Sequence, residues 1–218
     1  NASRAMKSKE AKLCADAGVK FQEFVVGNDG IALSNSLDGQ HFKISIAHIA
    51  AALAAELPYQ GSNLTNLSAN KLNTWAEVDA YTAKRTGAAP AGLPNIPVSV
   101  MVPPPTSGTR DAMGSLFMKA GWKKLGLDGK GYKKLREDGA AIEVGENDSL
   151  IIEKLAADKN MFGVFGYSFF DQNRDKVQAS IMDGVELNFE NIASYKYPGA
   201  RPLFCYVKTD HMGVIPGM

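Results

Sequence analysis

The run of three prolines, Pro103 to Pro105, constrains the fold more than any other stretch of the sequence. It follows an apolar, partly β-branched stretch at residues 96–102, which predicts a strand, and it precedes a helical pattern at residues 109–120. Proline lacks an N–H group, so it is excluded from the interior of central strands and of helices. The chain must therefore leave a strand and enter a helix within these few residues.

Strand and helix patterns alternate along the rest of the chain. Apolar stretches bounded by turn residues predict strands at 21–26, 31–34, 142–144, 161–167, 177–181 and 203–207. Periodic stretches predict helices at 8–18, 46–57, 75–79, 150–157 and 189–194, with long loops over the remainder of 59–95. Asn28-Asp29-Gly30 has turn chemistry and predicts a break between the first two strands. This alternation predicts the α/β class, with at least one largely parallel sheet.

Composition and charge exclude several classes of protein. The 218 residues are 45% hydrophobic and 22% charged, which is typical of globular chains. A net charge of +1 favours neither nucleic acid nor a membrane surface. The longest apolar run, residues 44–57, is interrupted by Ser45, His48 and Glu56 and is too short and too polar to span a bilayer. The polar start, NASRAMKSKE, shows no secretory signal, so we expect a cytosolic chain or the mature form of an exported one.

Cysteine and histidine give no sign of a metal site. Cys14 and Cys205 fit either two separate thiols or one disulfide that joins distant segments. His41, His48 and His211 lie far apart and in no ligand spacing. We expect neither a metal nor a cofactor.

The residues after the prolines are suited to an anion. The first N–H groups of a helix have no internal partner, and the helix dipole places partial positive charge there. Gly108 allows close approach to a ligand, Ser107 and Thr109 add hydroxyl donors, and Arg110 could add a planar fork. The alternative is that Ser107 and Thr109 are ordinary helix caps and that Arg110 lies on the surface.

Three other motifs give weaker evidence of a functional site. The stretch GLDGKGYKK at residues 126–134 lacks the spacing of a phosphate-binding loop, and no strand precedes it. Ser107 is not in a nucleophile elbow, and no histidine has a matching context. Glu146 and Asp148 lie beside an expected helix start, where acids usually act as caps. None of these motifs supports an enzyme.

Several stretches together resemble the periplasmic phosphate-binding protein of ABC phosphate uptake systems. They are NASRAMKSKE, VGNDGIALSNS, VPPPTSGTRDAM, GENDSLIIEKLAA, FGVFGYSFFDQN and NFENIASYKYPGARPLFCYVK. The resemblance implies a two-lobed protein with inorganic phosphate buried between the lobes, an ABC permease as partner, and a periplasmic or cell-surface location. It implies no catalysis and no metal. A related sensor, adhesin or scaffold with the cleft reused is the alternative.

The resemblance also implies particular site residues. The family's Ser-Gly-Thr anion loop falls on Ser107, Gly108 and Thr109, and its Ala-Ser-Arg or Ala-Ser-Asp element falls on Ala2, Ser3 and Arg4. Arg4 replaces an acid that accepts the proton of hydrogen phosphate, which removes the expected basis for rejecting sulfate. Pro103 stands where relatives often carry an arginine, and Arg110 is the candidate substitute.

The same resemblance implies a domain division. Residues 45–198 would form lobe two, while residues 1–44 and 199–218 would form part of lobe one, with hinges near Ile44 and Pro198. The family's first anion loop and its last helical segment have no counterpart here. We therefore expect one largely complete lobe, weak phosphate binding, and exposed strand edges through which two copies could form a homodimer.

Overall fold

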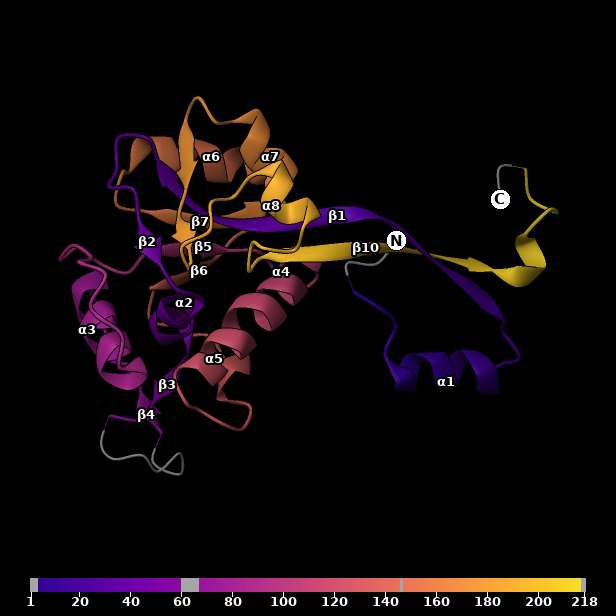
Figure 1. The fold of residues 1–218 in the computed structure, drawn as a ribbon, viewed down its shortest axis with the longest axis horizontal. Helices are drawn as coiled ribbons and strands as arrows, with labels where there is room; N and C mark the ends of the chain where they lie inside the picture. Colours follow the sequence, from indigo (N-terminus) through magenta and orange to yellow (C-terminus); the bar gives the residue numbers. More distant parts are fainter. Residues whose placement is uncertain (1–3, 60–66, 146, 217–218) are drawn as a thin grey trace.

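The computed structural model describes residues 4–59, 67–145 and 147–216, and it is built on one mixed sheet of six strands (Figure 1). The strands follow the spatial order β10-β1-β7-β5-β6, and β8 pairs with the end of β1. Their bounds are β1 Phe21–Ser36, β5 Val100–Val102, β6 Ala141–Glu143, β7 Phe162–Gly166, β8 Val177–Ala179 and β10 Ala200–Lys208. The α/β class is confirmed. The parallel part is confined to β5, β6 and β7, because β1 runs antiparallel to β7, β8 and β10.

Helices cover both faces of this sheet (Figure 1). On one side lie α2 and α3 with a continuous helical segment from Gly108 to Lys124, and on the other lie α6, α7 and α8. Their bounds are α2 Ile46–Leu53, α3 Trp75–Thr86, α6 Asp148–Ala157, α7 Tyr167–Gln172 and α8 Phe189–Ala193. The continuous segment consists of α4 Gly108–Ala112, the π-helix η1 Met113–Lys119 and α5 Ala120–Lys124.

Short elements complete the described part of the chain. Two small ladders pair β2 with β9 in parallel and β3 with β4 antiparallel. Their bounds are β2 Lys43–Ile44, β3 Glu56–Leu57, β4 Ser68–Ala69 and β9 Ile181–Met182, and the 3₁₀ turns are η2 Gly131–Lys133 and η3 Thr209–His211.

The core lies between the sheet and α2. Every residue of α2 is buried, so this alanine-rich helix is the central helix of its layer. Phe42, Trp75 and Phe162 form an aromatic cluster with ring centroids 4.5–5.3 Å apart. Such pairs add stability beyond the area they bury, and here they join the sheet to α3.

A two-stranded ribbon extends from this body (Figure 1). It consists of β1 residues 21–30 and their partner β10, and it leads to α1, Ser8–Asp16, at one end. Phe24, Val25 and Val26 on the ribbon are exposed, whereas β1 residues 30–36 are buried in the body.

The predicted turn at residues 28–30 is wrong. Strand β1 is continuous, because Asn28, Asp29 and Gly30 pair with Pro202, Arg201 and Ala200 of β10. The only register shift in this pairing lies earlier, between Val25 and Gly27. A ladder partner distant in sequence thus overrides local turn chemistry.

The structure also corrects several helix and strand limits. The helix predicted at 75–79 continues to Thr86 and ends at Gly87 in the left-handed conformation, at φ 72°. The helix predicted at 46–57 stops at Leu53, since residues 56–57 form β3. The strand predicted from residue 96 begins at Val100, and the helix predicted to end at residue 120 continues to Lys124.

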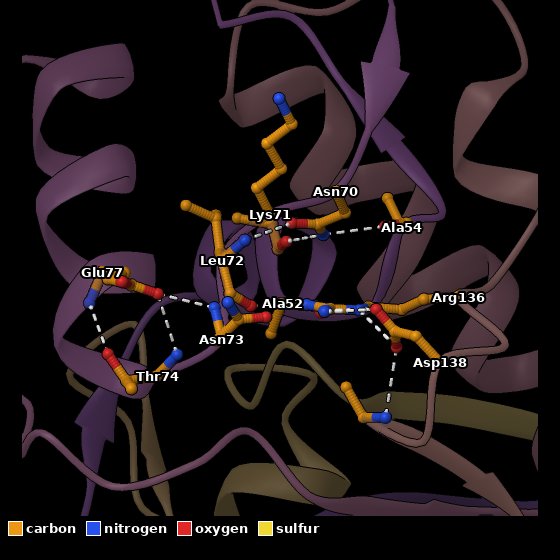
Figure 2. A network of polar contacts seen from close by, with 12 residues as sticks. Ala52, Ala54, Asn70, Lys71, Leu72, Asn73, Thr74, Glu77, Arg136 and Asp138 are labelled. Carbon is orange, nitrogen blue, oxygen red and sulfur yellow. Dashed lines mark hydrogen bonds and ion pairs between the residues drawn. The ribbon is translucent and has the colours of Figure 1, made fainter.

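A buried arginine fixes the loops around the end of α2 (Figure 2). Arg136 donates to the carbonyl oxygens of Leu72, at 2.5 Å, and Ala52, at 3.3 Å, and its other nitrogens bind the Asp138 carboxylate. Asn70 donates in the same region to the carbonyl oxygens of Ala51 and Ala54. The bonds to Ala51, Ala52 and Ala54 satisfy carbonyl groups at the end of α2 that have no partner inside the helix, and the bond to Leu72 holds the loop before α3.

Two glycines of the long helical segment give a matched test of the packing. A Cβ at Gly121 would overlap the Ile46 carbonyl oxygen and approach Ala50 Cβ to 2.8 Å, whereas a Cβ at Gly114 meets no atom within 4 Å. We expect Gly121→Ala to destabilise the fold by about 1–3 kcal/mol through overpacking against α2. Gly114→Ala should be neutral or stabilising by up to about 1 kcal/mol. Urea denaturation measures both, and equal effects would contradict the close contact of α2 and α5.

Candidate anion-binding site

The loop from Pro103 to Thr109, the anion loop, connects β5 to the long helical segment. Ser107 is the N-cap: its backbone is extended, and its side-chain oxygen accepts the Thr109 N–H at 3.1 Å. The Ser107 N–H donates to the Pro104 carbonyl oxygen at 3.0 Å, which closes the turn after the prolines. The predicted strand-to-helix junction is therefore present, and the helix begins at Gly108.

A hollow of about 310 Å³ opens over the anion loop. It is lined by Pro103, Pro104, Thr106, Ser107, Gly108, Thr109, Gly145 and Ile151. Most of these are loop residues at the carboxyl ends of the parallel strands β5 and β6, the edge at which α/β sheets bind ligands. The start of the helical segment adds partial positive charge there. The hollow therefore has the polarity and the position of a small-anion site.

Arg201 holds the anion loop in place, and we did not predict this role from the sequence. The side chain is buried; one terminal nitrogen donates to the Gly108 carbonyl oxygen at 2.7 Å, and two nitrogens donate to Asp29 at 2.8 and 3.1 Å. Asp29 and Arg201 are also direct partners in the β1–β10 ladder. The signal in the sequence was the arginine of GARPLF, a charged residue just before an apolar strand.

Arg110 points to its own loop. It donates to the Pro103 carbonyl oxygen at 2.6 Å and lies 3.8 Å from the Glu143 carboxylate. Its side chain is partly buried, and burial lowers the pKa of Arg110 while Glu143 acts in the opposite direction. Arg110 lines a second, larger cavity, and it is not among the residues that line the hollow over the anion loop.

Arg4 lines that second cavity as well. Two of its nitrogens bind the Glu10 carboxylate at 2.7 and 2.8 Å, and its Nε lies 4.0 Å from Asp111. The hydrogen bond to Glu10 raises the pKa of Arg4, and the same bond lowers the pKa of Glu10 to about 2. Ala2 and Ser3, the other residues of this predicted element, lie outside the described residues.

The sequence model of the PBP superfamily domain matches residues 1–218. The chain belongs to the PBP superfamily. Phosphate-binding protein PstS of Staphylococcus epidermidis is 25% identical over 213 residues, which are 95% of this chain and 53% of that protein. Protein SphX of Synechococcus elongatus is 24% identical over 213 residues, which are 95% of this chain and 52% of that protein. This PBP domain thus spans about half the length of the curated relatives it matches.

Solved structures agree with this PBP assignment. An ABC-type phosphate transport receptor from Vibrio cholerae superimposes with a TM-score of 0.60 over 96% of this chain and 66% of that one. The sequence identity is 17%, so the likeness supports the fold alone.

Three further features of the PBP domain concern metal ligands, cysteines and membrane spans. Among residues 4–59, 67–145 and 147–216, no three histidine, cysteine, aspartate or glutamate side chains gather as metal ligands. Cys14 and Cys205 are both free, so the alternative of a disulfide between them is not realised. Within the described ranges, no helix has the length and apolar character needed to cross a membrane.

One cluster has the residue types of a hydrolase. His48 Nε2 lies 3.1 Å from Asp79, and Nδ1 accepts the Ser45 N–H at 3.0 Å. The Ser45 hydroxyl oxygen accepts the Ala47 N–H as the N-cap of α2, and Asp79 accepts three N–H bonds from residues 91–93. Burial raises the pKa of Asp79, but the hydrogen bonds outweigh it and the pKa lies below its ordinary value. We therefore assign this cluster a structural role: Ser45 and His48 cap α2, and Asp79 holds the loop at residues 91–93.

The role of Arg201 can be tested against a surface arginine. Arg201→Met removes hydrogen bonds to Gly108 and Asp29, and we expect a loss of about 2–3 kcal/mol in the free energy of unfolding. Arg174→Met is the control, because Arg174 makes an exposed ion pair with Asp171 that contributes about 0–1 kcal/mol. Urea denaturation gives both values. If the two variants lose the same stability, Arg201 does not hold the anion loop.

Proposed function

We propose that this chain binds inorganic phosphate at the anion loop and takes part in its delivery to an ABC permease. The observation that carries the proposal is the Ser107-Gly108-Thr109 helix start, which lines a hollow of about 310 Å³. The named PstS relative, aligned over 95% of this chain, supports phosphate as the anion. Hydrogen bonds from helix N–H groups and hydroxyls to a charged oxyanion are the strong kind.

The proposal includes a division into two lobes. Residues 45–198 form lobe two, and residues 1–44 and 199–218 form part of lobe one, with phosphate in the cleft between them. Strand β1 lies wholly in the lobe-one range, and its residues 31–36 join the two lobes because they pair with β7 and β8 of lobe two. The ribbon and α1 belong to the lobe-one part.

Ser3, Arg4 and Arg110 have a secondary role in this proposal. Arg4 and Arg110 approach the start of the helical segment from the side of the larger cavity, and they add positive charge close to the anion loop. An acid that could accept the proton of hydrogen phosphate is replaced by Arg4, so we propose weak discrimination between phosphate and sulfate.

We propose a periplasmic or cell-surface location. We also propose binding without catalysis, in line with the names of a phosphate-binding protein and a phosphate transport receptor among the similar proteins. The alternative is a related sensor or scaffold in which the cleft binds another anion or none. Phosphate titration separates the two, because a scaffold has no need of an occupied anion loop.

The threonine hydroxyl gives the sharpest test of phosphate binding. Thr109→Val keeps the volume and removes one donor to a charged oxygen, which is worth about 1.5–3 kcal/mol. We expect phosphate affinity to fall by about ten- to a hundredfold, measured by calorimetry or by the shifts of the Gly108 and Thr109 amide signals in NMR.

The control for this test is Thr86→Val. Thr86 is exposed at the end of α3, where its hydroxyl donates to the Thr82 carbonyl oxygen. Phosphate affinity should be unchanged in this variant. Unchanged affinity in Thr109→Val would remove the anion loop from the proposal.

We also propose that two copies of the chain associate through the ribbon. Val25 and Val26 are each 61% exposed, and β10 is paired only with β1 in the described sheet. Unpaired strand edges with apolar side chains favour strand addition. Sedimentation over a range of concentrations should show a dimer, and Val25→Lys should shift it toward the monomer. A monomer at all concentrations would contradict this part of the proposal.

A further inference from the structure

The largest of the cavities described above lies beside the anion loop, on the η1 face of the long helical segment. Its volume is about 640 Å³, roughly twice that of the hollow over Ser107–Thr109. The N-terminal segment at Arg4 and Lys7 forms one wall, and η1 with η2 forms the other. This size lies within the range of about 300–1,000 Å³ typical of sites for organic ligands. We refer to it as the basic cavity.

Positive side chains surround the basic cavity. They are Arg4, Lys7, Arg110, Lys119 and Lys133, against one acidic lining residue, Asp111. Arg4 is partly neutralised by Glu10 and Asp111, and Arg110 lies 3.8 Å from Glu143. Lys7, Lys119 and Lys133 have no ion pair within the described part of the chain. The cavity thus keeps an excess of positive charge and favours a ligand with more than one negative charge.

The basic cavity also has apolar lining. Tyr132 and Leu135 are half-buried and present part of their side chains to it, whereas Met113 and Met118 are almost fully buried behind them. A tyrosine ring makes favourable contacts with a flat aromatic group. A bare phosphate ion would leave this surface uncovered.

The helix itself is unusual where it borders the cavity. Residues 113–119 form a π-helix, a rare form that often marks functional sites. Gly114 lies in this segment and lines the cavity, and a Cβ placed there meets no protein atom within 4 Å. Packing does not require a glycine at this position, and the absence of a side chain leaves the cavity open.

We propose that the basic cavity binds an organic phosphate monoester with a planar ring. The phosphate lies among Arg110, Lys119 and Lys133, and the ring lies against Tyr132 and Leu135. Pro105 of the anion loop borders the basic cavity, but no residue lines both this cavity and the hollow over the loop, and the inference does not depend on phosphate binding in that hollow.

The first experiment compares three probes on the whole chain by calorimetry: adenosine monophosphate, adenosine and inorganic phosphate. Only the monophosphate can make both the charge contacts and the ring contacts, because adenosine has no charge and inorganic phosphate has no ring. We expect the wild-type chain to bind it at least about tenfold more tightly than adenosine, because each charge-assisted hydrogen bond contributes about a factor of ten or more. Raising the ionic strength should weaken this binding, since the lysines are exposed. Equal affinity for adenosine and its monophosphate would overturn the proposal.

The second experiment locates the site. Gly114→Leu fills the basic cavity, and Gly114→Ala is the matched control that changes the helix but leaves most of the volume open. We expect Leu to reduce affinity for adenosine monophosphate by about tenfold or more and Ala to reduce it by less than about twofold. Equal binding by both variants would overturn the proposal.

Thr109→Val separates this site from the anion loop. It should weaken inorganic phosphate and leave adenosine monophosphate unchanged, whereas Gly114→Leu should do the reverse. A chain that fails to bind inorganic phosphate but shows this response to Gly114→Leu would refute the proposed function and support the basic cavity. Loss of adenosine monophosphate binding in Thr109→Val with no effect of Gly114→Leu would place the organic anion at the anion loop and overturn this inference.

Discussion

The Arg201 side chain joins the ribbon to the anion loop. Its guanidinium binds Asp29 of the neighbouring strand and the Gly108 carbonyl oxygen of the anion loop. A planar group with several donors in fixed directions can hold a carboxylate and a carbonyl group at once, which a lysine cannot do. Because this contact reaches from the ribbon to the first residue of α4, the position of the helix start depends on the ribbon.

Local chemistry made the strand-to-helix junction predictable. Prolines end a strand, a serine caps a helix, and a glycine follows, and each of these preferences acts over a few residues. The structure shows the cap at Ser107 and the helix from Gly108. A similar signal was available but not used at α3, where Thr74 and Glu77 form a capping box and Gly87 ends the helix. The α/β class was predictable for the same reason, since it follows from the alternation of local patterns.

Contacts between distant residues account for what the sequence did not reveal. The turn predicted at Asn28-Asp29-Gly30 is absent because β10, more than 160 residues away, supplies a ladder partner for each of them. Arg110 is next to the predicted anion loop in sequence, yet its side chain bonds to Pro103 and faces Glu143, whose position depends on the pairing of β5 with β6. The π-helix at residues 113–119 has no signature of residue type, and neither does the cavity beside it.

The continuity of β1 has a mechanical consequence. A single strand runs from the exposed ribbon into the centre of the sheet, and it exchanges β10 for β7 as its partner at Gly30 and Ile31 (Figure 1). Strand β1 is paired along nearly all of its length, with one irregularity between Val25 and Gly27, so bending the ribbon relative to the sheet would break hydrogen bonds of its ladders. The pair Asp29 and Arg201 lies where the ribbon meets the body, directly beside the Gly108 carbonyl group. A twist of the ribbon would therefore act on the start of the long helical segment through Arg201, and on the end of α8 through Asn28, which donates to the Ala193 carbonyl oxygen.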